Sequence, residues 1–343
     1  MNRPRAYTES RSQIVRARLE VLFSFLERHG FVLGLILVTG LTLADDAELS
    51  VQWGRWLKEH HAPNVLIGAI FFFSGLSLEK ETLYKGVLDL KAVLGALSLI
   101  FLVSPLWALA LAREPLGPGL TVGLFLVASM PTTLSSGVVL TGAAGGNMAT
   151  ALLITIVSNS AAVFVTPFLL EFLVGQTVTP TSMELHKTSL MITLVALVFA
   201  PLALGMSLRA AWLTLSQRIK GPQPSTLNTF LVLCIVWIGV CGSRHTMVQG
   251  VHLLPLVVAL SVVFHGGLLL CAFLMARALK LSVGRREAVI FMGGQKTLPL
   301  SVLIQTAVFP QYGEALVFCV CHHVVHLVMD GCVLSFIKNF KKG

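Results

Sequence analysis

The segment Phe291-Met292-Gly293-Gly294-Gln295-Lys296-Thr297-Leu298-Pro299 interrupts a hydrophobic stretch near the end of the sequence. Apolar, helix-forming residues lie on both sides of it, but two glycines and a proline are poor helix formers. A lysine at bilayer depth costs about 2.5–3.5 kcal/mol on the insertion scale, and backbone groups freed by a break are tolerated in a membrane only around a cavity. The segment therefore predicts a broken membrane helix that forms half of a substrate site in a transporter.

The composition is that of a polytopic membrane protein in a lipid bilayer. Of the 343 residues, 55% are hydrophobic and 12% are charged, with a mean hydropathy of +0.83, whereas a soluble domain carries roughly 25% charged residues. The formal net charge of +9 does not indicate a nucleic-acid partner, because no basic stripe interleaved with aromatic residues occurs. Paired carboxylates, a nucleophile elbow and zinc-hydrolase spacing are absent from the sequence, so we expect neither an enzyme nor a cofactor.

The hydropathy pattern predicts an all-α protein with ten transmembrane helices. Residues 1–29 are expected to form a cytoplasmic segment, amphipathic over 8–29. With ten spans, most of the 25 Lys and Arg residues fall on the side that holds both termini, which predicts an N-in, C-in orientation. We place the spans near 30–45, 62–78, 88–112, 119–140, 147–174, 187–208, 226–243, 252–278, 286–309 and 313–337.

The fourth predicted span is also interrupted, by Met130-Pro131-Thr132-Thr133-Leu134-Ser135-Ser136-Gly137. Two interrupted helices at corresponding places in two five-span halves predict an inverted repeat, with the binding site where the breaks meet. Each new half-helix then presents free N–H groups and the positive end of its dipole. A Pro-Ser-Thr cluster on its own could instead mark a kinked structural helix. The hydroxyl groups expected at the crossing belong to Thr132, Thr133, Ser135 and Ser136.

At this point the sequence resembles the bile acid:sodium symporter family, in the subgroup similar to solute carrier family 10 member 7 and its bacterial relatives. The resemblance covers nearly all of residues 30–337. It implies a transporter domain over 30–343 in a bacterial inner (plasma) membrane, with repeats at about 30–174 and about 187–337. Helices 1, 2, 6 and 7 would form a panel and helices 3, 4, 5, 8, 9 and 10 a core, with broken helices 4 and 9 crossing near the midplane. The motifs that carry it are Phe71-Phe72-Phe73-Ser74-Gly75-Leu76-Ser77-Leu78, the 131–137 break, Gly145-Gly146-Asn147 and the 291–300 segment.

Sodium-coupled members of that family bind two sodium ions at the crossing, and the resemblance matches Ser136 and Thr155 with ligands of those ions. Four other positions depart from the pattern, so that a carboxylate is lost and an ammonium is gained. Because two cations in one small cavity repel strongly at low dielectric, this argues against ordinary sodium coupling. The departures are Gly137 for asparagine, Ala151 for serine, Met292 for glutamate and Lys296 for glutamine.

Our hypothesis is that Lys296 stands in for the cation. Since burial disfavours a charged amine, Lys296 could also release a proton during transport, and its positive field favours an anionic substrate. The alternative is a static lysine that locks the helix crossing. The groups expected to receive the ammonium are Ser136, Thr155, Gln295, Thr297 and neighbouring carbonyls.

The tenth span carries several further polar residues. His322, His326 and Asp330 are spaced to share one helix face, which could be a metal site, although intramembrane histidines more often line a polar path and we expect no metal. His323 matches a histidine of the family, and Asp330 could be a counter-ion for Lys296 if the geometry allows. Buried polar side chains in the fifth span are expected at Asn147, Ser158 and Asn159.

These observations predict a secondary-active transporter of an organic anion, either bile-acid-like or another small carboxylate or sulfate. Alternating access would be coupled to protons through Lys296 or to no ion. One alternative is a sodium:organic anion symporter with altered ligands. Another, of a different class, is a membrane receptor or regulator that has the transporter fold without transporting. The sequence leaves the oligomeric state open.

Overall fold

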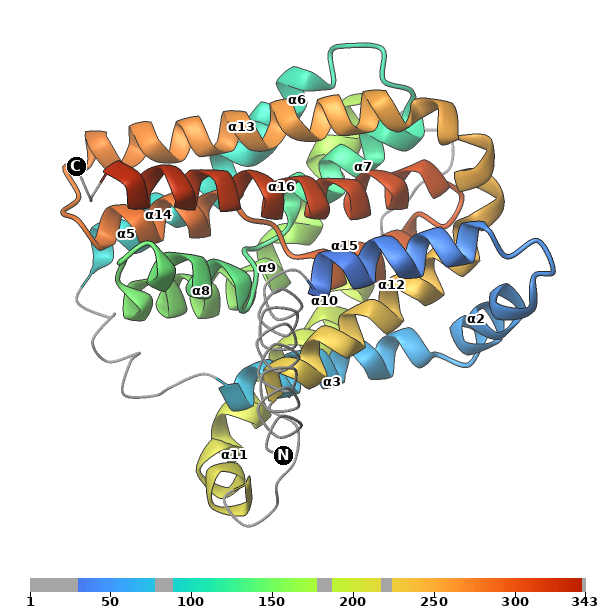
Figure 1. The fold of residues 1–343 in the computed structure, drawn as a ribbon, viewed down its shortest axis with the longest axis horizontal. Coiled ribbons are helices and arrows are strands. Elements are labelled where there is room, and N and C mark those ends of the chain that lie inside the picture. Colours follow the sequence, from blue (N-terminus) through green and yellow to red (C-terminus); the bar gives the residue numbers. More distant parts are fainter. Residues whose placement is uncertain (1–29, 78–88, 178–186, 217–223, 341–343) are drawn as a thin grey trace, which may run out of the picture.

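The computed structural model describes residues 30–77, 89–177, 187–216 and 224–340, and the regular elements within these ranges are all helices (Figure 1). The predicted amphipathic helix over 8–29 lies outside them. The elements are a first helix Gly30–Leu43, α2 (Leu49–Glu59), α3 (Ala62–Ser77), α5 (Leu90–Ser98), η1 (Leu99–Val103), α6 (Ser104–Leu111), α7 (Pro118–Ser129), α8 (Ser136–Ala143), α9 (Met148–Thr177), α10 (Lys187–Leu194), η2 (Val195–Phe199), α11 (Ala200–Ser216), α12 (Pro224–Gln249), η3 (Val251–Leu253), α13 (Leu254–Ala278), α14 (Arg285–Gly294), α15 (Leu298–Val308) and α16 (Gly313–Phe340).

Long apolar helices make this an integral membrane protein. In the described part of the chain, 6 helical stretches are long and apolar enough to cross a bilayer, and three shorter apolar helices accompany them. Each of the ten predicted spans contains helix, whereas the division into two inverted five-helix repeats stays a prediction. The long stretches are Leu90–Leu111, Met148–Gln176, Lys187–Thr214, Thr226–Gln249, Val251–Ala278 and Gly313–Asn339, and the shorter helices are Gly30–Leu43, Ala62–Ser77 and Pro118–Ser129.

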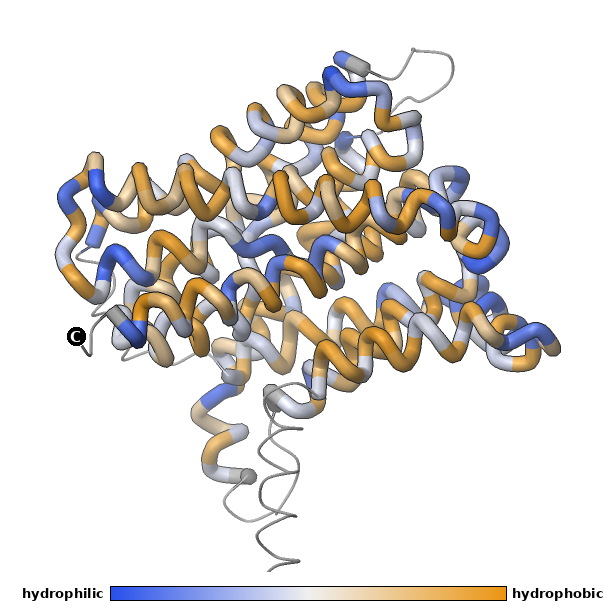
Figure 2. Tube along the Cα trace, turned by 45° about the horizontal axis from the view of Figure 1, so that its top comes forward, coloured by the Kyte–Doolittle hydropathy of each residue, from blue (hydrophilic) through white to orange (hydrophobic). Residues whose placement is uncertain are grey.

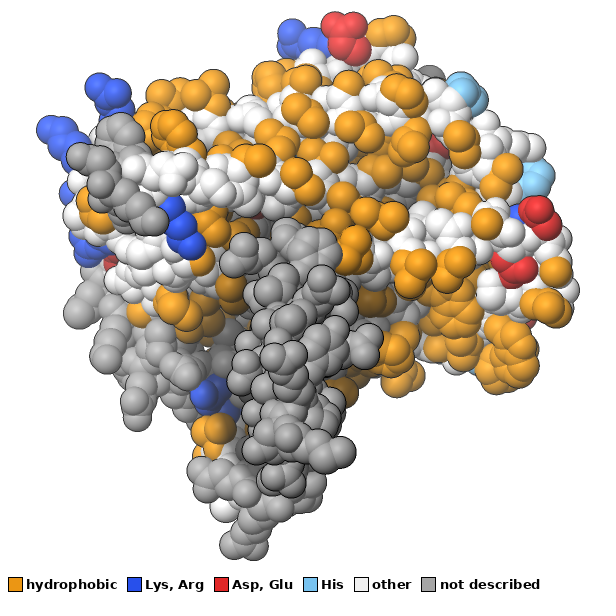
Figure 3. All heavy atoms as spheres, in the orientation of Figure 1, with side chains coloured by type: hydrophobic (Ala, Val, Ile, Leu, Met, Phe, Trp, Pro, Cys, Tyr) orange, Lys and Arg blue, Asp and Glu red, His pale blue; other side chains and the backbone are white. Residues whose placement is uncertain are grey.

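The surface of the molecule is suited to lipid. Phe164, Phe168 and Phe172 form an exposed stripe along α9. Hydrophobic residues make up most of the long helices, and many of the hydrophilic residues gather at the helix ends (Figure 2). On the face drawn in Figure 3, most Lys and Arg side chains lie at the end that holds the C-terminus, with acidic and histidine side chains at the opposite end. An apolar band between polar ends is typical of a membrane protein.

The helix α2 was not predicted from the sequence, which placed no element between residues 45 and 62. It begins after a loop in which the carboxylate of Asp45 accepts hydrogen bonds from the backbone N–H (2.7 Å) and Oγ (2.5 Å) of Ser50, and this lowers the pKa of Asp45. Trp53 and Trp56 are exposed on α2. Amphipathic helices with exposed tryptophans are typical of the membrane interface. The hydropathy pattern did not reveal α2, because it shows only a polar segment between the first two predicted spans.

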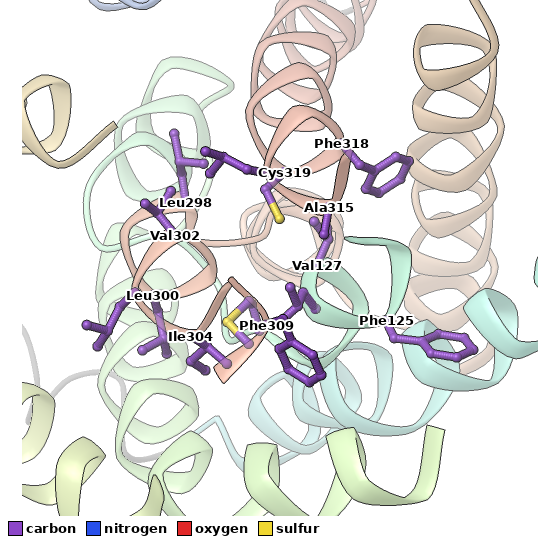
Figure 4. Close-up of a cluster of buried hydrophobic side chains, with 14 of the residues drawn as sticks. Phe125, Val127, Leu298, Leu300, Val302, Ile304, Phe309, Ala315, Phe318 and Cys319 are labelled. Carbon is purple, nitrogen blue, oxygen red and sulfur yellow. The ribbon is translucent and has the colours of Figure 1, made fainter. Parts of the chain in front are cut away.

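The helices pack in two groups. The helix α3 packs most extensively on α11 and α12, while α16 packs on α7 and α13, and α13 on α14. The short helix α15 packs on α7, α12 and α16, and Figure 4 shows Leu298, Val302, Ala315 and Cys319 among the buried side chains of this cluster. This packing fixes the position of α15, the helix that follows the second break.

The crossing of α3 and α11 depends on two glycines, Gly75 and Gly205. A Cβ added to Gly205 would overlap the carbonyl oxygen of Phe72 and lie 3.0 Å from the backbone nitrogen of Leu76. We therefore expect Gly205→Ala to destabilise the protein by about 1–3 kcal/mol, because the atoms in the way belong to the backbone and cannot rotate aside. Thermal unfolding in detergent measures this effect.

The matched control for that variant is Gly331→Ala in α16, where nothing lies within 4 Å of the added Cβ. The control should keep or slightly raise the unfolding midpoint, since alanine is the better helix former. Equal midpoints for the two variants would contradict close packing at the α3–α11 crossing.

Both predicted interruptions are present as breaks between helices. Residues 130–135 separate α7 from α8, and residues 295–297 separate α14 from α15. The backbone N–H of Thr297 donates to the carbonyl of Pro131 at 3.0 Å, so the two breaks touch.

Candidate functional site

The ammonium of Lys296 is held by backbone carbonyls at the point where the breaks meet. Its Nζ donates to Ile100 O (2.9 Å), Ala128 O (3.0 Å) and Met130 O (3.0 Å), and the residue is 2% exposed. These three bonds use all the donors of an ammonium. They go to carbonyls rather than to the predicted side chains of Ser136, Thr155, Gln295 and Thr297, because α7 ends here with carbonyls that have no partner inside the helix.

The carbonyl of Ile100 is open to Lys296 because the helix around it is not α-helical. Residues Leu99–Val103 form a π-helix, in which the N–H of Ser104 reaches the carbonyl of Leu99. In this pattern the next donor, to Ile100, would be residue 105, which is a proline and has no N–H. Because Pro105 cannot donate, the carbonyl of Ile100 is free to accept a hydrogen bond from Lys296. Turns of π-helix frequently mark functional sites.

Three further carbonyls at the first break are paired as well. Two of them accept from side chains of α9, and a third accepts from the backbone of the second break. Backbone polar groups inside a membrane must be satisfied within the protein, so the break is stable as an open segment. The pairs are Thr166 Oγ1 to Ser129 O (2.9 Å), Asn159 Nδ2 to Thr132 O (3.2 Å) and Thr297 N to Pro131 O (3.0 Å).

Gln295 joins the two breaks to α16 through its amide. The amide oxygen accepts from Thr133 Oγ1 (2.5 Å) and Ser136 Oγ (2.9 Å), and Nε2 donates to Asp330 Oδ2 (2.6 Å). The orientation of the amide follows from its partners, since an ionised carboxylate only accepts. A chain of hydrogen bonds therefore runs from the hydroxyls of the first break to a buried carboxylate.

Asp330 is also bonded to His265 of α13. His265 Nε2 lies 2.9 Å from Asp330 Oδ1, and both residues are 0% exposed. Asp330 is thus not the counter-ion of Lys296, because the ammonium is already surrounded by carbonyls. His322 and His326 are buried on the same helix, with ring centroids 5.6 Å apart. Across the described residues, no group of three His, Cys, Asp or Glu side chains is arranged to hold a metal ion.

A cavity of about 180 Å³ opens beside both breaks. The first turns of α8 and α15 border it, so two positive helix ends face the same space. Helix α12 and the first helix form the facing wall together with α3. The lining residues are Phe31, Ile70, Thr133, Leu134, Ser135, Ser136, Asn228, Thr229, Val232, Thr297, Leu298, Pro299, His323 and Leu327.

Three of the four positions that depart from the sodium-ligand pattern carry no polar side chain in this chain: Gly137, Ala151 and Met292. Ala151 and Met292 belong to one buried apolar cluster with Val138 and Ile154. A Cβ on Gly137 would meet Met292 Sδ at 2.6 Å, so the methionine fills the space beside that glycine. The side chains at these three positions therefore supply no oxygen atom that could bind a sodium ion.

The remaining predicted site residues have mostly local partners. Thr155 Oγ1 donates to Ala151 O (3.0 Å) within α9, and Ser158 Oγ donates to Thr155 O (3.2 Å). Thr132 is buried, and its hydroxyl has no partner among the described residues. The prediction that Asn147 is buried was wrong: it is exposed and precedes α9, where its Oδ1 accepts from the N–H groups of Ala149 (2.9 Å) and Thr150 (3.2 Å), because a helix needs such a cap.

Sequence reasoning missed His265 and Asn228. Each is a polar residue inside a long apolar run, which is the signal that could have identified them. Asn228 Nδ2 donates to Ser74 Oγ (2.6 Å) across the α3–α12 contact, and its Oδ1 is buried without a partner in the described part of the chain. The link between His265 and Asp330 needs two helices to be placed side by side, which no local pattern gives.

Comparison with known proteins gives a match over nearly the whole chain. A model of the SBF-like CPA transporter family matches residues 29–339. The sodium/bile acid cotransporter 7-A of Xenopus laevis is 26% identical over 330 residues, which cover 93% of this chain and 94% of that protein. The sodium/bile acid cotransporter 7 of Danio rerio is 26% identical over 334 residues, with 94% and 97% covered. The probable sodium/metabolite cotransporter BASS4, chloroplastic, of Arabidopsis thaliana is 26% identical over 328 residues, with 92% and 73% covered.

Proposed function

The chain belongs to the SBF-like CPA transporter family, and we propose that it is a secondary-active transporter that carries a small organic anion by alternating access. The observation that supports this most directly is the cavity, which both broken helices border on one side and α3 and α12 on the other. Substrate sites of repeat-built transporters lie where discontinuous helices meet. The position of the cavity therefore fits a substrate site.

An anion suits the electrostatics of this cavity. The N-termini of α8 and α15 contribute two positive dipole ends, and the ammonium of Lys296 adds a fixed charge behind them. Ser136 supplies a hydroxyl, while Ile70 and Val232 supply apolar surface. The volume of about 180 Å³ is below the roughly 300–1,000 Å³ of sites for drug-sized ligands, so a small carboxylate fits better than a bile acid.

Alternating access requires two bodies that move against each other. The packing of α3 with α11 and α12 supports a panel of the first helix, α3, α10–α11 and α12, and the packing of α16 with α7 and α13 supports a core. The cavity lies between these groups. We propose that the core rocks against the panel, with the end that carries Arg285 and Arg286 on the cytoplasmic side of a bacterial inner membrane.

Lys296 takes the place of a coupling cation in this proposal. The names of the relatives refer to sodium cotransport, so the competing interpretation is a sodium:organic anion symporter with altered ligands. Two features support the first reading: the apolar cluster that holds Ala151 and Met292, and the complete use of the ammonium by carbonyls. A second cation beside Lys296 would be repelled.

Uptake of benzoate into proteoliposomes tests the proposal. Benzoate is a probe with one carboxylate and a small apolar body. We expect equal uptake in sodium and in choline buffer, because in this proposal Lys296 takes the place of the coupling cation. Strong stimulation by sodium that persists in Lys296→Ala would favour the sodium symporter, and tight binding of organic acids without any flux would favour a receptor or regulator.

The hydroxyl of Ser136 should contribute to anion binding. Ser136→Ala is expected to weaken benzoate binding by about tenfold or more, since a hydrogen bond to a charged group contributes about 1.5–3 kcal/mol. The shift of the unfolding midpoint with benzoate concentration measures the affinity. Ser335→Ala is the matched control, because Ser335 is an exposed serine that bonds only its own helix, at Gly331 O (3.0 Å). Equal affinity of both variants would remove Ser136 from the site.

A further inference from the structure

The buried pair of Asp330 and His265 has no role in the transport scheme described so far. A carboxylate at membrane depth is costly, and such residues in transporters hold protons or ions. The pair is linked to the cavity by Gln295, whose amide bonds Asp330 on one side and the hydroxyls of Thr133 and Ser136 on the other. We propose that Asp330 is the proton-binding site of this transporter and that Gln295 couples its protonation to anion binding.

The coupling follows from the polarity of the hydrogen bonds. When Asp330 is ionised, Gln295 must turn its NH₂ to the carboxylate and its oxygen to Thr133 and Ser136. The hydroxyl proton of Thr133 then points at Gln295, and that of Ser136 points at Gln295 or at Thr133 Oγ1 (2.9 Å), so neither is directed at the cavity. A proton on Asp330 Oδ2 makes that oxygen a donor, so the amide turns over and presents its NH₂ to the hydroxyl oxygens. The hydroxyl protons of Thr133 and Ser136 are then free for an anion.

The proton has a route from the cavity to Asp330. His323 lines the cavity, its ring centroid is 4.4 Å from that of His326, and His326 is 5.5 Å from His265. Both ring nitrogens of His326 and the Nδ1 atoms of His323 and His265 are buried without a hydrogen-bond partner among the described residues. Open imidazole nitrogens in a row are suited to passing a proton, alone or with water between them.

The charged and titratable neighbours of Asp330 are few. Helix α16 adds His322 and His326, and the second break adds Lys296. Helix α12 also packs on α16, but its Arg244 and His245 lie near the start of α16, where Thr246 meets Gly313. Helices α7, α8 and α15 carry no Asp, Glu, His, Lys or Arg, and Glu287 lies at the far end of α14, where its carboxylate accepts from the N–H of Gly284. Since Lys296 is fixed on three carbonyls and the imidazoles pass the proton on, we assign the resident proton to Asp330, the carboxylate of this group. This assignment departs from our expectation that Lys296 itself carries the proton.

This inference rests on the proposed anion transport and adds that the anion is transported together with one proton, as proton:anion symport. One proton enters from water, resides on Asp330 and leaves with the anion. Because one proton is linked to binding, benzoate affinity should fall about tenfold per pH unit once the pH exceeds the titration point of Asp330. Asp330→Asn should bind benzoate with little dependence on pH, since its neutral amide can donate to Gln295 as the protonated acid does.

Infrared difference spectroscopy of the full chain between an acidic and an alkaline buffer tests the proton site without any ligand. We expect the C=O band of a protonated carboxylic acid at the lower pH, absent from Asp330→Asn and shifted in Asp330→Glu, which serves if the asparagine variant fails to fold. Asp89→Asn is the control: Asp89 is a buried carboxylate that bonds Thr150 (3.3 Å) and Arg285 (2.7 Å) away from the cavity, and the band should persist.

The two measurements separate this inference from the function it rests on. A titrating band with no binding of benzoate or any other organic acid would leave the proton site standing and contradict the proposed function. Binding of benzoate that is independent of pH in the wild type, or a band that survives in Asp330→Asn, would overturn the proton site and leave anion transport untouched.

Discussion

Replacing Lys296 with methionine is expected to destabilise the protein strongly. Methionine keeps the length and the apolar stem but removes the ammonium, so the carbonyls of Ile100 and Met130 lose their only described donor. Ala128 O keeps the hydroxyl of Ser104 at 3.0 Å. Each buried acceptor left unpaired costs about 1–3 kcal/mol, and the effect should appear as a large fall in the unfolding midpoint in detergent.

Two further lysine variants sharpen this experiment. Lys187→Met removes a half-exposed lysine paired with Glu171 (2.7 Å), and should change stability by less than about 1 kcal/mol. Lys296→Arg keeps the charge but brings a planar fork in place of a compact ammonium, so we expect an intermediate loss. If Lys296→Met unfolds at the wild-type temperature, the carbonyls are satisfied in another way and the ammonium does not hold the crossing together.

Replacing Gln295 with methionine is expected to abolish pH-dependent anion binding and to lower stability strongly. The change removes the donor to Asp330 Oδ2 and the acceptor of Thr133 and Ser136 in one step. Removing the partner of a buried charge costs about 3–5 kcal/mol, because the charge stays in place without compensation. Benzoate binding at several pH values and thermal unfolding measure the two effects.

A double-mutant cycle decides whether the cost comes from the charge of Asp330. Adding Asp330→Asn to Gln295→Met removes the uncompensated carboxylate, so the double variant should be more stable than Gln295→Met alone by about 0.5–3 kcal/mol. Destabilisation that simply adds would show that Gln295 acts through packing only. Thr306→Val is a suitable control, because the hydroxyl of Thr306 bonds only carbonyls of its own helix, at 2.8 and 3.1 Å.

The sequence predicted the membrane class, the helices and both breaks because these depend on local composition. Gly293, Gly294 and Pro299 weaken a helix wherever they occur, and Pro131 does the same in the first break. The helix α2 was missed because its hydrophobic face is too short for a span. Its amphipathic pattern is visible in Trp53 and Trp56, but hydropathy averaged over a span-sized window hides it.

The partners inside the site were not predictable in the same way. That Lys296 needs polar surroundings follows from its cost in a bilayer. That these surroundings are Ile100 O, Ala128 O and Met130 O depends on a π-helical turn before Pro105 and on where α7 ends. The pairing of His265 with Asp330 joins helices that are distant in sequence, and only three-dimensional packing brings them together.

The capture of Lys296 by carbonyls of the first break also has a consequence for biosynthesis. The ribosome makes α7 long before it makes Lys296, with about half of the chain between them. At a rate of synthesis of about 5–20 residues per second, the carbonyls at the end of α7 lack the ammonium of Lys296 for on the order of 10 to 30 seconds. A nascent chain that stops before Lys296 therefore carries an unfinished fourth span, and its amino-terminal half on its own should be a substrate for membrane proteases.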